Sequence, residues 1–374
     1  SRRDRPFDEQ RTLGFLAQAP FHPRRLMMQF YTQQRQFYCG IDLHATCMFV
    51  CVLDDRGNIL LHKNFLCKDA NLFLQAIEPY KQGLVVGCES TFNWYWLADL
   101  LEEKNIEFIL GHALYMKSIY IAKVKSDSID SEKIARLIRG GTFPLAHAYP
   151  KEYRASRDLL RRRAYLVRRR AEALTHIQQI HHQHNQGVTT NIRYKSNRQG
   201  LGESLPSEHA KLMVSIDLEM IDAYTIQIKR IEDELVRSVK LTHFQSYYRL
   251  TTIPGVGAMI SLTMIHEIET IQRFAGVGKF LSYCRLVKGS HSSAGKKLGA
   301  PGGKIGNPYL RWAFGEAIQL LKRESKEVLE YARRLEKKHG KARATNILAV
   351  KLGRSVYYML RDDRAFDLNK FLQH

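Results

Sequence analysis

Residues 38–65 are YCGIDLHATCMFVCVLDDRGNILLHKNF, three short runs rich in β-branched and aromatic residues. The segment Asp54–Asn58 (DDRGN) is a strong turn signal between the second run and the third. The pattern predicts three successive antiparallel strands, at about 37–43, 46–53 and 58–65. Further along, helical patterns near 72–77, 92–104 and 131–139 alternate with strand-like runs at 84–88 and 106–110. Three strands followed by alternating helix and strand predict an α/β domain with a mixed sheet over residues 37–148.

Two further regions follow this domain. Residues 149–245 repeat apolar residues at helical spacing on both sides of a polar loop near 185–207, which predicts a basic helical hairpin or coiled-coil linker. Residues 246–374 predict a mostly helical C-terminal domain. It opens with LTTIPGVG (250–257), which favours a helix-hairpin-helix-like turn, the alternative being a plain helix–loop–helix with Pro254 as its stop.

The net charge of the chain indicates what kind of partner it binds. Lys and Arg number 58 against 37 Asp and Glu, a formal net charge of +21, and such an excess favours a nucleic-acid partner. A membrane partner is disfavoured because no apolar run approaches the roughly 18 residues that span a bilayer. Residues 1–36 predict a basic, extended arm on nucleic acid and lack the apolar core of a secretory signal. The six cysteines form no CxxC pair, which favours reduced thiols and a cytoplasmic location.

The first half of the predicted hairpin carries two arginine triplets. Six arginines within ten residues would repel one another on an isolated helix, so we expect them to contact phosphates. The alternative is a solvated helix face. The six residues are Arg161, Arg162, Arg163, Arg168, Arg169 and Arg170.

Four carboxylates of the α/β domain form a candidate metal site. Asp42 lies within the first strand, where a buried charge needs a partner or a metal, and Glu89 ends a buried strand. Asp127 and Asp130 are three residues apart at the start of a predicted helix, so they share a face. Carboxylates converging in this way suit Mg²⁺ and phosphodiester chemistry. As alternatives, Asp130 is a helix N-cap, Glu89 an ordinary strand-end residue, and Asp42 the partner of a lysine at 123 or 125. The order of these acids on this strand pattern resembles the RNase H-like (RuvC-like) nucleases of the Holliday-junction resolvase type.

Residues 285–311 (RLVKGSHSSAGKKLGAPGGKIGNPYLR) form a basic, glycine-rich segment without an acid. Glycines allow close approach of a phosphate chain and lysines neutralise it, so contacts are expected from Lys296, Lys297, Lys304 and Arg311. The hydroxyl side chains before Tyr309 are Ser290, Ser292 and Ser293. No acid of the segment could activate them, and by itself the segment predicts a flexible basic loop.

The runs HSSAGK (291–296), GKIGN (303–307) and Leu310-Arg311, together with IPGVG (253–257), resemble one family of insertion-sequence transposases. These are recombinases with an N-terminal Asp-Glu-Asp-Asp domain, related to the Piv-type DNA invertases. The resemblance covers roughly residues 37–360 and joins two separate motifs in the right order. It implies a RuvC-like domain, a coiled-coil linker and a serine-bearing transposase domain.

The resemblance also implies a mechanism. The carboxylates would bind Mg²⁺ beside a serine that attacks a DNA phosphate, within a dimer or tetramer, and a structured RNA from the element would guide the choice of DNA. The nucleophile carried over is Ser293, but Ala294 stands where many relatives have glycine, which leaves Ser292 as the alternative. Two other functions stay open: a junction-type, Mg²⁺-dependent endonuclease that uses water, and a non-catalytic nucleic-acid-binding protein.

Overall fold

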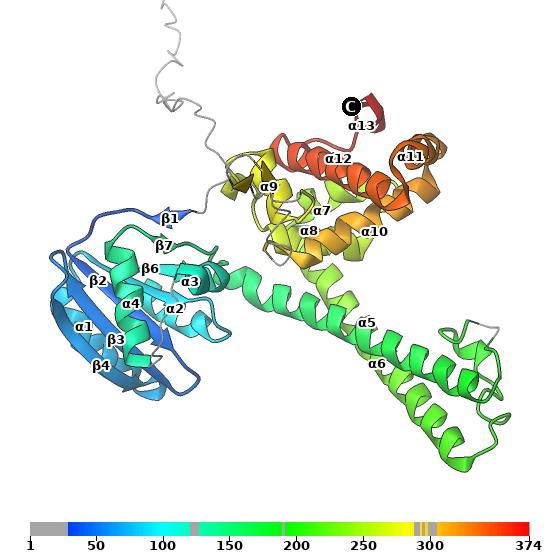
Figure 1. Cartoon of the computed structure of the whole chain (residues 1–374), viewed down its shortest axis with the longest axis horizontal. Coiled ribbons are helices and arrows are strands. Elements are labelled where there is room, and N and C mark those ends of the chain that lie inside the picture. The colour runs from blue at the N-terminus through cyan, green and yellow to red at the C-terminus, as the bar shows by residue number, and fades with distance from the viewer. Residues whose placement is uncertain are drawn as a thin grey trace, which may run out of the picture.

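The structure is a computed structural model that describes residues 29–119, 127–188, 191–287, 292–293, 296–297 and 305–373. An α/β part, a long helical hairpin and a group of C-terminal helices follow one another along the chain (Figure 1). The hairpin projects from the junction of the other two parts, and its tip is the end farthest from the sheet.

The α/β part is built on a five-stranded sheet in the order β4-β3-β2-β5-β6. Its strands are β2 (Phe37–Leu43), β3 (Cys47–Asp54), β4 (Ile59–Leu66), β5 (Leu84–Glu89) and β6 (Glu107–Gly111). The first three are antiparallel neighbours, whereas β2–β5 and β5–β6 are parallel pairs. The predicted antiparallel strands and the mixed sheet are confirmed.

Helices cover both faces of this sheet: α1 (Ala70–Ile77) and α2 (Trp94–Glu103) lie on one face, and α4 (Asp127–Arg139) lies on the other. One face packs on α1 and α2 through a core that includes Ile41, Val86, Phe73 and Leu97. The other face packs on α4, with Tyr38 and Val85 against the helix. Helix α3 (Ala113–Ile119) follows β6. Because strand side chains alternate between faces, even positions of β2 and odd positions of β5 face α4.

The expectation of a separate arm up to residue 36 needs a correction. Strand β1 (Phe30–Tyr31) pairs antiparallel with β7 (Phe143–Pro144). Tyr31 is buried with Tyr38 and Phe143 in the core under α4. These residues therefore belong to the α/β part, because their backbone pairing and an aromatic side chain are satisfied there. Residues 1–28 of the predicted arm lie outside the described residues.

The hairpin consists of α5 (Lys151–Gln183) and α6 (Glu208–Thr242), two helices linked by the turn-rich segment 184–207, which includes one short 3₁₀ helix (Lys195–Asn197). Cross-contacts pair Arg163 with Glu232 near the base and His176 with Asp217 farther out, so the helices are antiparallel. Near the tip, Ile177 and Ile180 pack with Ile221 and other apolar side chains. Two long helices joined by a polar loop were predicted and are observed.

The C-terminal part is helical and shares one core with the base of the hairpin, since Leu160 and Leu235 pack into it. Its helices are α7 (Phe244–Thr251), α8 (Ala258–Ile268), α9 (Val277–Tyr283), α10 (Pro308–Glu324), α11 (Lys326–His339), α12 (Lys341–Arg361) and α13 (Leu368–Gln373). None of the helices in the described ranges combines the length and apolarity needed to cross a bilayer.

The turn between α7 and α8 contains Gly255 with φ +81°, a conformation that favours glycine. A Cβ there would lie 2.9 Å from the backbone of Leu320 in α10. Two helices joined by a short turn are present, as both the helix-hairpin-helix-like prediction and its plain helix–loop–helix alternative require, and this glycine permits close packing of two helices. Phosphate contact by the turn stays a prediction.

Candidate functional site

Asp42 and Glu89 lie side by side at one edge of the sheet. The parallel register of β2 and β5 pairs Ile41 with Cys88, so the next residue of each strand is aligned with the other. Both carboxylates are at the C-terminal ends of their strands, and both are partly exposed. Burial raises the pKa of the Cys88 thiol, and the charges of Glu89 and Asp42 raise it further. The negative charges of Asp42 and Glu89 therefore both act on the Cys88 thiol.

Helix α4 brings its N-terminal end to the same edge. Gly40 has no side chain, and α4 packs so closely there that a Cβ would overlap the backbone of Ser131 and Ala135. Tyr38, two residues before Gly40 on β2, packs in the core that contains Leu137 from the later part of the helix. Helix α4 thus runs opposite to β2, and its first turn lies beside Asp42.

The first turn of α4 contains the two remaining predicted acids. Asp130 is paired with Lys133 at 2.9 Å and keeps about a quarter of its side chain exposed (26%). Asp127 is the first residue of α4, but its side chain is outside the described residues. Among the described side chains, no three acidic, histidine or cysteine groups are close enough to hold a metal. The two acids that the sheet register aligns, Asp42 and Glu89, offer carboxylate oxygens, the type of donor that Mg²⁺ prefers.

Two histidines contact this edge without having been assigned a role from the sequence. His44 Nε2 lies 3.2 Å from Asp42 Oδ2. His62, on β4, lies 3.0 Å from the carbonyl oxygen of Ser128 and 3.4 Å from Ser131 Oγ. His44 follows β2 directly, two residues after Asp42, and this close spacing is a signal that could have identified it.

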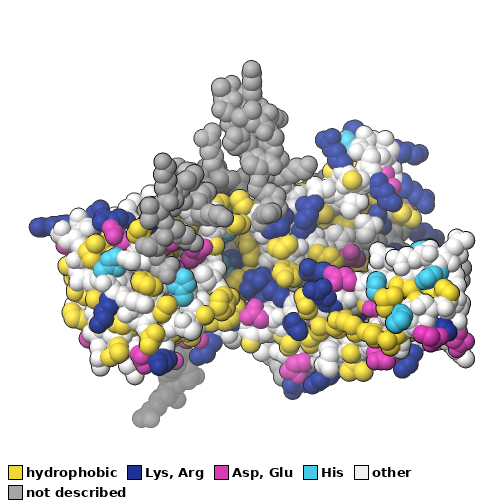
Figure 2. Space-filling model, turned by 60° about the horizontal axis from the view of Figure 1, so that its bottom comes forward, with side chains coloured by type: hydrophobic (Ala, Val, Ile, Leu, Met, Phe, Trp, Pro, Cys, Tyr) yellow, Lys and Arg dark blue, Asp and Glu magenta, His cyan; other side chains and the backbone are white. Residues whose placement is uncertain are grey.

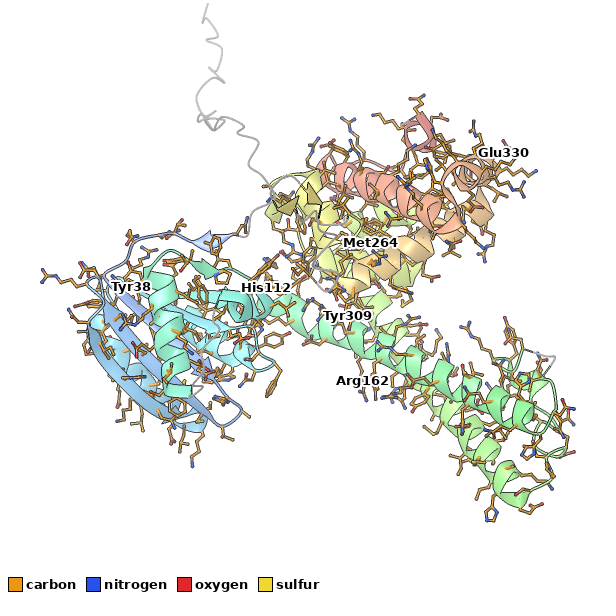
Figure 3. All side chains as sticks on the ribbon, in the orientation of Figure 1. Tyr38, His112, Arg162, Met264, Tyr309 and Glu330 are labelled. Atoms are coloured by element: carbon orange, nitrogen blue, oxygen red, sulfur yellow. The ribbon has the colours of Figure 1, made fainter. Side chains whose placement is uncertain are left out.

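The six arginines of α5 divide into two groups. Arg161 and Arg163 are bound to Glu267 and Glu232, so these two guanidinium groups are committed to partners within the chain. Arg162 projects from the outer side of α5 (Figure 3), and Arg168 is exposed. Arg169 bridges to Glu172 on the surface, and Arg170 reaches Thr225 of α6. On the face in Figure 2, Lys and Arg side chains gather near the middle of the molecule.

The structure describes the two ends of the serine segment. Arg285 donates to the carbonyl oxygen of Gly306 at 2.9 Å, and Arg311 donates to the carbonyl oxygen of Arg285 at 2.7 Å. Between these ends, Ser292–Ser293 (β8) pairs antiparallel with Lys296–Lys297 (β9). The side chains of these four residues, and all of Lys304, lie outside the described residues. The two ends of the segment are therefore joined at its base.

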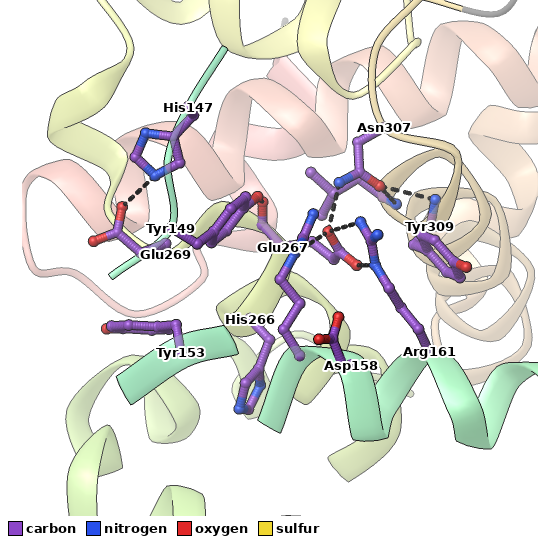
Figure 4. A network of polar contacts seen from close by, with 12 residues as sticks. His147, Tyr149, Tyr153, Asp158, Arg161, His266, Glu267, Glu269, Asn307 and Tyr309 are labelled. Carbon is purple, nitrogen blue, oxygen red and sulfur yellow. Dashed lines mark hydrogen bonds and ion pairs between the residues drawn. The ribbon is translucent and has the colours of Figure 1, made fainter. Parts of the chain in front are cut away.

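Below this base lies a buried network that the sequence did not predict (Figure 4). Glu267 of α8 is fully buried (0% exposed) and accepts hydrogen bonds from Arg157, Arg161 and Asn307. Asn307, which follows the serine segment, also caps α10 by accepting from the backbone N–H of Tyr309 at 2.9 Å.

The network has a second layer made of tyrosines. The Tyr149 hydroxyl donates to the carbonyl oxygen of Glu267 at 2.9 Å and lies 2.9 Å from the Tyr283 hydroxyl. Tyr149 precedes α5, and Tyr283 ends α9 just before the serine segment. Glu267 therefore joins three segments: its backbone carbonyl holds Tyr149, and its carboxylate holds the start of the hairpin and Asn307 at the base of the serine segment.

The comparisons with known proteins agree with this architecture. Residues 39–185 match the family described as "Transposase", the IS110-type transposase domain with the Asp-Glu-Asp-Asp acids, and such a domain implies an RNase H-like fold. Residues 247–333 match the family described as "Transposase IS116/IS110/IS902 family". The matched regions contain the mixed sheet with its edge carboxylates and much of the C-terminal helical part, and they define the class as transposases.

Two curated relatives are also transposases of insertion sequences. The chain is 23% identical over 332 residues to the transposase for insertion sequence element IS1111A of Coxiella burnetii, covering 86% of this chain and 88% of that protein. It is 22% identical over 335 residues to the transposase for IS1328 of Yersinia enterocolitica, covering 87% of this chain and 97% of that protein. The chain belongs to the IS110 family of insertion-sequence transposases. Membership implies DNA binding and DNA recombination.

Proposed function

We propose that this transposase excises and inserts DNA by Mg²⁺-assisted attack of a serine hydroxyl on a DNA phosphate. The observation that supports the metal site best is the alignment of Asp42 and Glu89 on neighbouring parallel strands, with the first turn of α4 beside them. In this proposal residues 37–148, together with β1, are the RuvC-like domain, and residues 149–245 and 246–374 are the linker and serine domains.

Four carboxylates would hold the metal: Asp42, Glu89, Asp127 and Asp130. When bound, Mg²⁺ supplies a positive charge that polarises a phosphate oxygen. His44 orients the Asp42 carboxylate through their 3.2 Å contact, since a fixed partner restricts the rotation of a ligand. Asp130, which pairs with Lys133 at 2.9 Å, would join them from the first turn of α4.

The serine step forms one bond and breaks one. Ser293 Oγ bonds to phosphorus, the bond from phosphorus to one deoxyribose oxygen breaks, the serine proton passes to solvent and the leaving oxygen takes up a proton. The DNA is then joined to the protein through a phosphate ester, and attack by a second DNA hydroxyl releases the serine and rejoins the strand. Ser292 is the alternative nucleophile.

The remaining basic residues would hold the nucleic acid. The exposed Arg162 and Arg168 of α5 suit phosphates, and Arg169 is kept because its bridge to Glu172 is open to solvent, whereas Arg161 and Arg163 are left out because less accessible carboxylates of the chain hold them. The proposed contacts are Arg162, Arg168, Arg169, Arg170, Lys296, Lys297, Lys304 and Arg311. We further propose a guide RNA from the element, a dimer or tetramer as the active form, and action in the cytoplasm, where all six free cysteines stay reduced.

Denaturing gels of cleaved element DNA test the serine. Ser293→Ala is expected to abolish the protein–DNA adduct while leaving DNA binding intact. Adducts that persist in both Ser293→Ala and Ser292→Ala would refute the serine step, and free DNA ends in place of adducts would favour an endonuclease that uses water.

A second experiment tests the metal site. Asp42→Asn and Glu89→Gln are expected to lower Mg²⁺-dependent cleavage at least about 100-fold, because the metal supplies several kcal/mol of transition-state stabilisation. DNA binding without cleavage is measured as the control. Unchanged cleavage in both variants would contradict the metal site.

A further inference from the structure

Phe92 is the most exposed large hydrophobic side chain in the described part of the chain, with 82% of its surface accessible. It lies in the short loop between β5 and α2, three residues after Glu89. The next aromatic residue, Trp94, is buried in the sheet core. An isolated aromatic ring standing in water beside a candidate catalytic edge requires an explanation, because covering it would be favourable.

The loop itself is held firmly. Asn93 Nδ2 donates to the carbonyl oxygen of His44 at 2.6 Å, and Thr91 Oγ1 donates to Asn93 Oδ1 at 2.9 Å. The Ser90 backbone N–H donates to the carbonyl oxygen of Gly111 at 3.0 Å. The residues on both sides of Phe92 are therefore anchored to neighbouring strand ends, and the ring is exposed because the backbone holds it there.

The ring is also close to both strand-end carboxylates. Three residues span at most about 10 Å of extended chain, so Phe92 lies within that reach of Glu89. Its neighbour Asn93 is bonded to the backbone of His44, whose ring contacts Asp42. Phe92 thus stands next to the place where, under the proposed function, a DNA phosphate is held.

We propose that Phe92 stacks on a DNA base next to the phosphate at which the Asp42 and Glu89 carboxylates would hold the metal. This inference rests on the proposed function. Among the parts of DNA, phosphate is anionic and sugar is bulky, whereas a base has a flat face that matches an aromatic ring. Bases inside a duplex are covered on both sides. The substrate class is therefore DNA with an unpaired or opened base next to the reacting phosphate, and Phe92 is a specificity-determining residue for it.

The test measures binding by the full chain, without cleavage. The probes are a labelled oligothymidylate of about 20 nucleotides, longer than common single-strand site sizes, and its duplex with oligodeoxyadenylate. Phe92→Ala is expected to weaken single-strand binding about tenfold and duplex binding much less, because one stacked base is lost. Phe92→Tyr, which keeps the ring, is expected to restore binding. Leu72→Ala, which removes another exposed apolar side chain (56%) of the α/β part, is the matched control.

A second readout locates the contact. One thymine is replaced by 5-iodouracil, and irradiation is expected to cross-link the probe to the tryptic peptide 82–104, with the cross-link lost in Phe92→Ala. Wild-type affinity of Phe92→Ala, or no cross-link in this peptide, overturns the proposal. Oligouridylate is measured as an RNA probe. If Phe92→Ala weakens the binding of oligouridylate but leaves the binding of oligothymidylate unchanged, the assignment of the ligand to DNA is overturned. Failure of the proposed metal site appears separately, as unchanged cleavage by Asp42→Asn, since the stacking assay involves no cleavage.

Discussion

Glu267→Gln is the sharpest test of how the three parts of the chain are held together. The glutamine has the same shape and can still accept hydrogen bonds, but the negative charge is lost. Two guanidinium groups then remain without a counter-ion, and their side chains are only 12% (Arg157) and 31% (Arg161) exposed. Breaking a buried ion pair in this way costs about 3–5 kcal/mol. Because water reaches Arg161, we expect the lower end, about 3 kcal/mol.

Urea unfolding of the full chain, followed by far-ultraviolet circular dichroism, measures this loss in the free energy of unfolding. The matched control is Glu232→Gln, whose partner Arg163 is on the same helix as Arg161 but whose carboxylate is 26% exposed. For that pair we expect a loss of about 1 kcal/mol. If Glu267→Gln lies within about 1 kcal/mol of the wild type, the account of the network is wrong.

The pH dependence gives an independent check. Burial alone would raise the pKa of Glu267, but the hydrogen bond from Arg161 and the charges of Arg157 and Arg161 outweigh burial and lower it. A carboxylate whose pKa is lowered by folding stabilises the fold above its ordinary pKa, and this stability is lost as the pH falls through the folded value. The difference between the wild type and Glu267→Gln should therefore shrink below about pH 4.5. A difference that stays constant into acid would contradict the electrostatic explanation.

Three further predictions concern packing, DNA contact and pH. Gly40→Ala forces the backbone of α4 away from the sheet and should cost about 3 kcal/mol in urea unfolding, whereas Gly257→Ala, with nothing within 4 Å of the new Cβ, should cost little. Equal losses in both variants would refute this. Arg168→Ala should reduce the slope of log affinity for DNA against log salt concentration by about 1. The control Arg163→Ala, which removes an arginine already paired with Glu232, should leave this slope nearly unchanged. DNA-binding titrations at several salt concentrations measure both slopes. His147 Nε2 lies 3.2 Å from a carboxylate oxygen of Glu269, but burial, together with the charges of Arg273 and Arg157, outweighs this contact and lowers the pKa of His147 to about 4. Wild-type stability should therefore fall between about pH 6.5 and 4 as unfolding allows this histidine to bind a proton. About 1 kcal/mol is expected because a third of the side chain is exposed, and thermal unfolding of His147→Gln should show a smaller loss over the same range.

Much of the α/β part was predictable because its signals are local. Alternating apolar residues determine which side of a strand is buried, and the segment Asp54–Asn58 marks a turn, whichever strands become neighbours. The two strand-end acids were visible for the same reason, since Asp42 interrupts an apolar strand and Glu89 ends one. Repeats at helical spacing likewise predicted the two long helices of the hairpin.

Sequence alone determined the strands, the long helices, the basic character and the acids at strand ends, because burial periodicity and charge are properties of short segments. The tertiary structure determined which side chains and strands contact one another. Arginines of one run suit a phosphate or a carboxylate equally, and only the packing of α8 against α5 brings Glu267 to Arg161, 106 residues away. Tyr31 joined the sheet domain through a strand pairing more than 100 residues distant in the chain. Such contacts depend on which surfaces meet in the folded chain, and no local pattern encodes that choice.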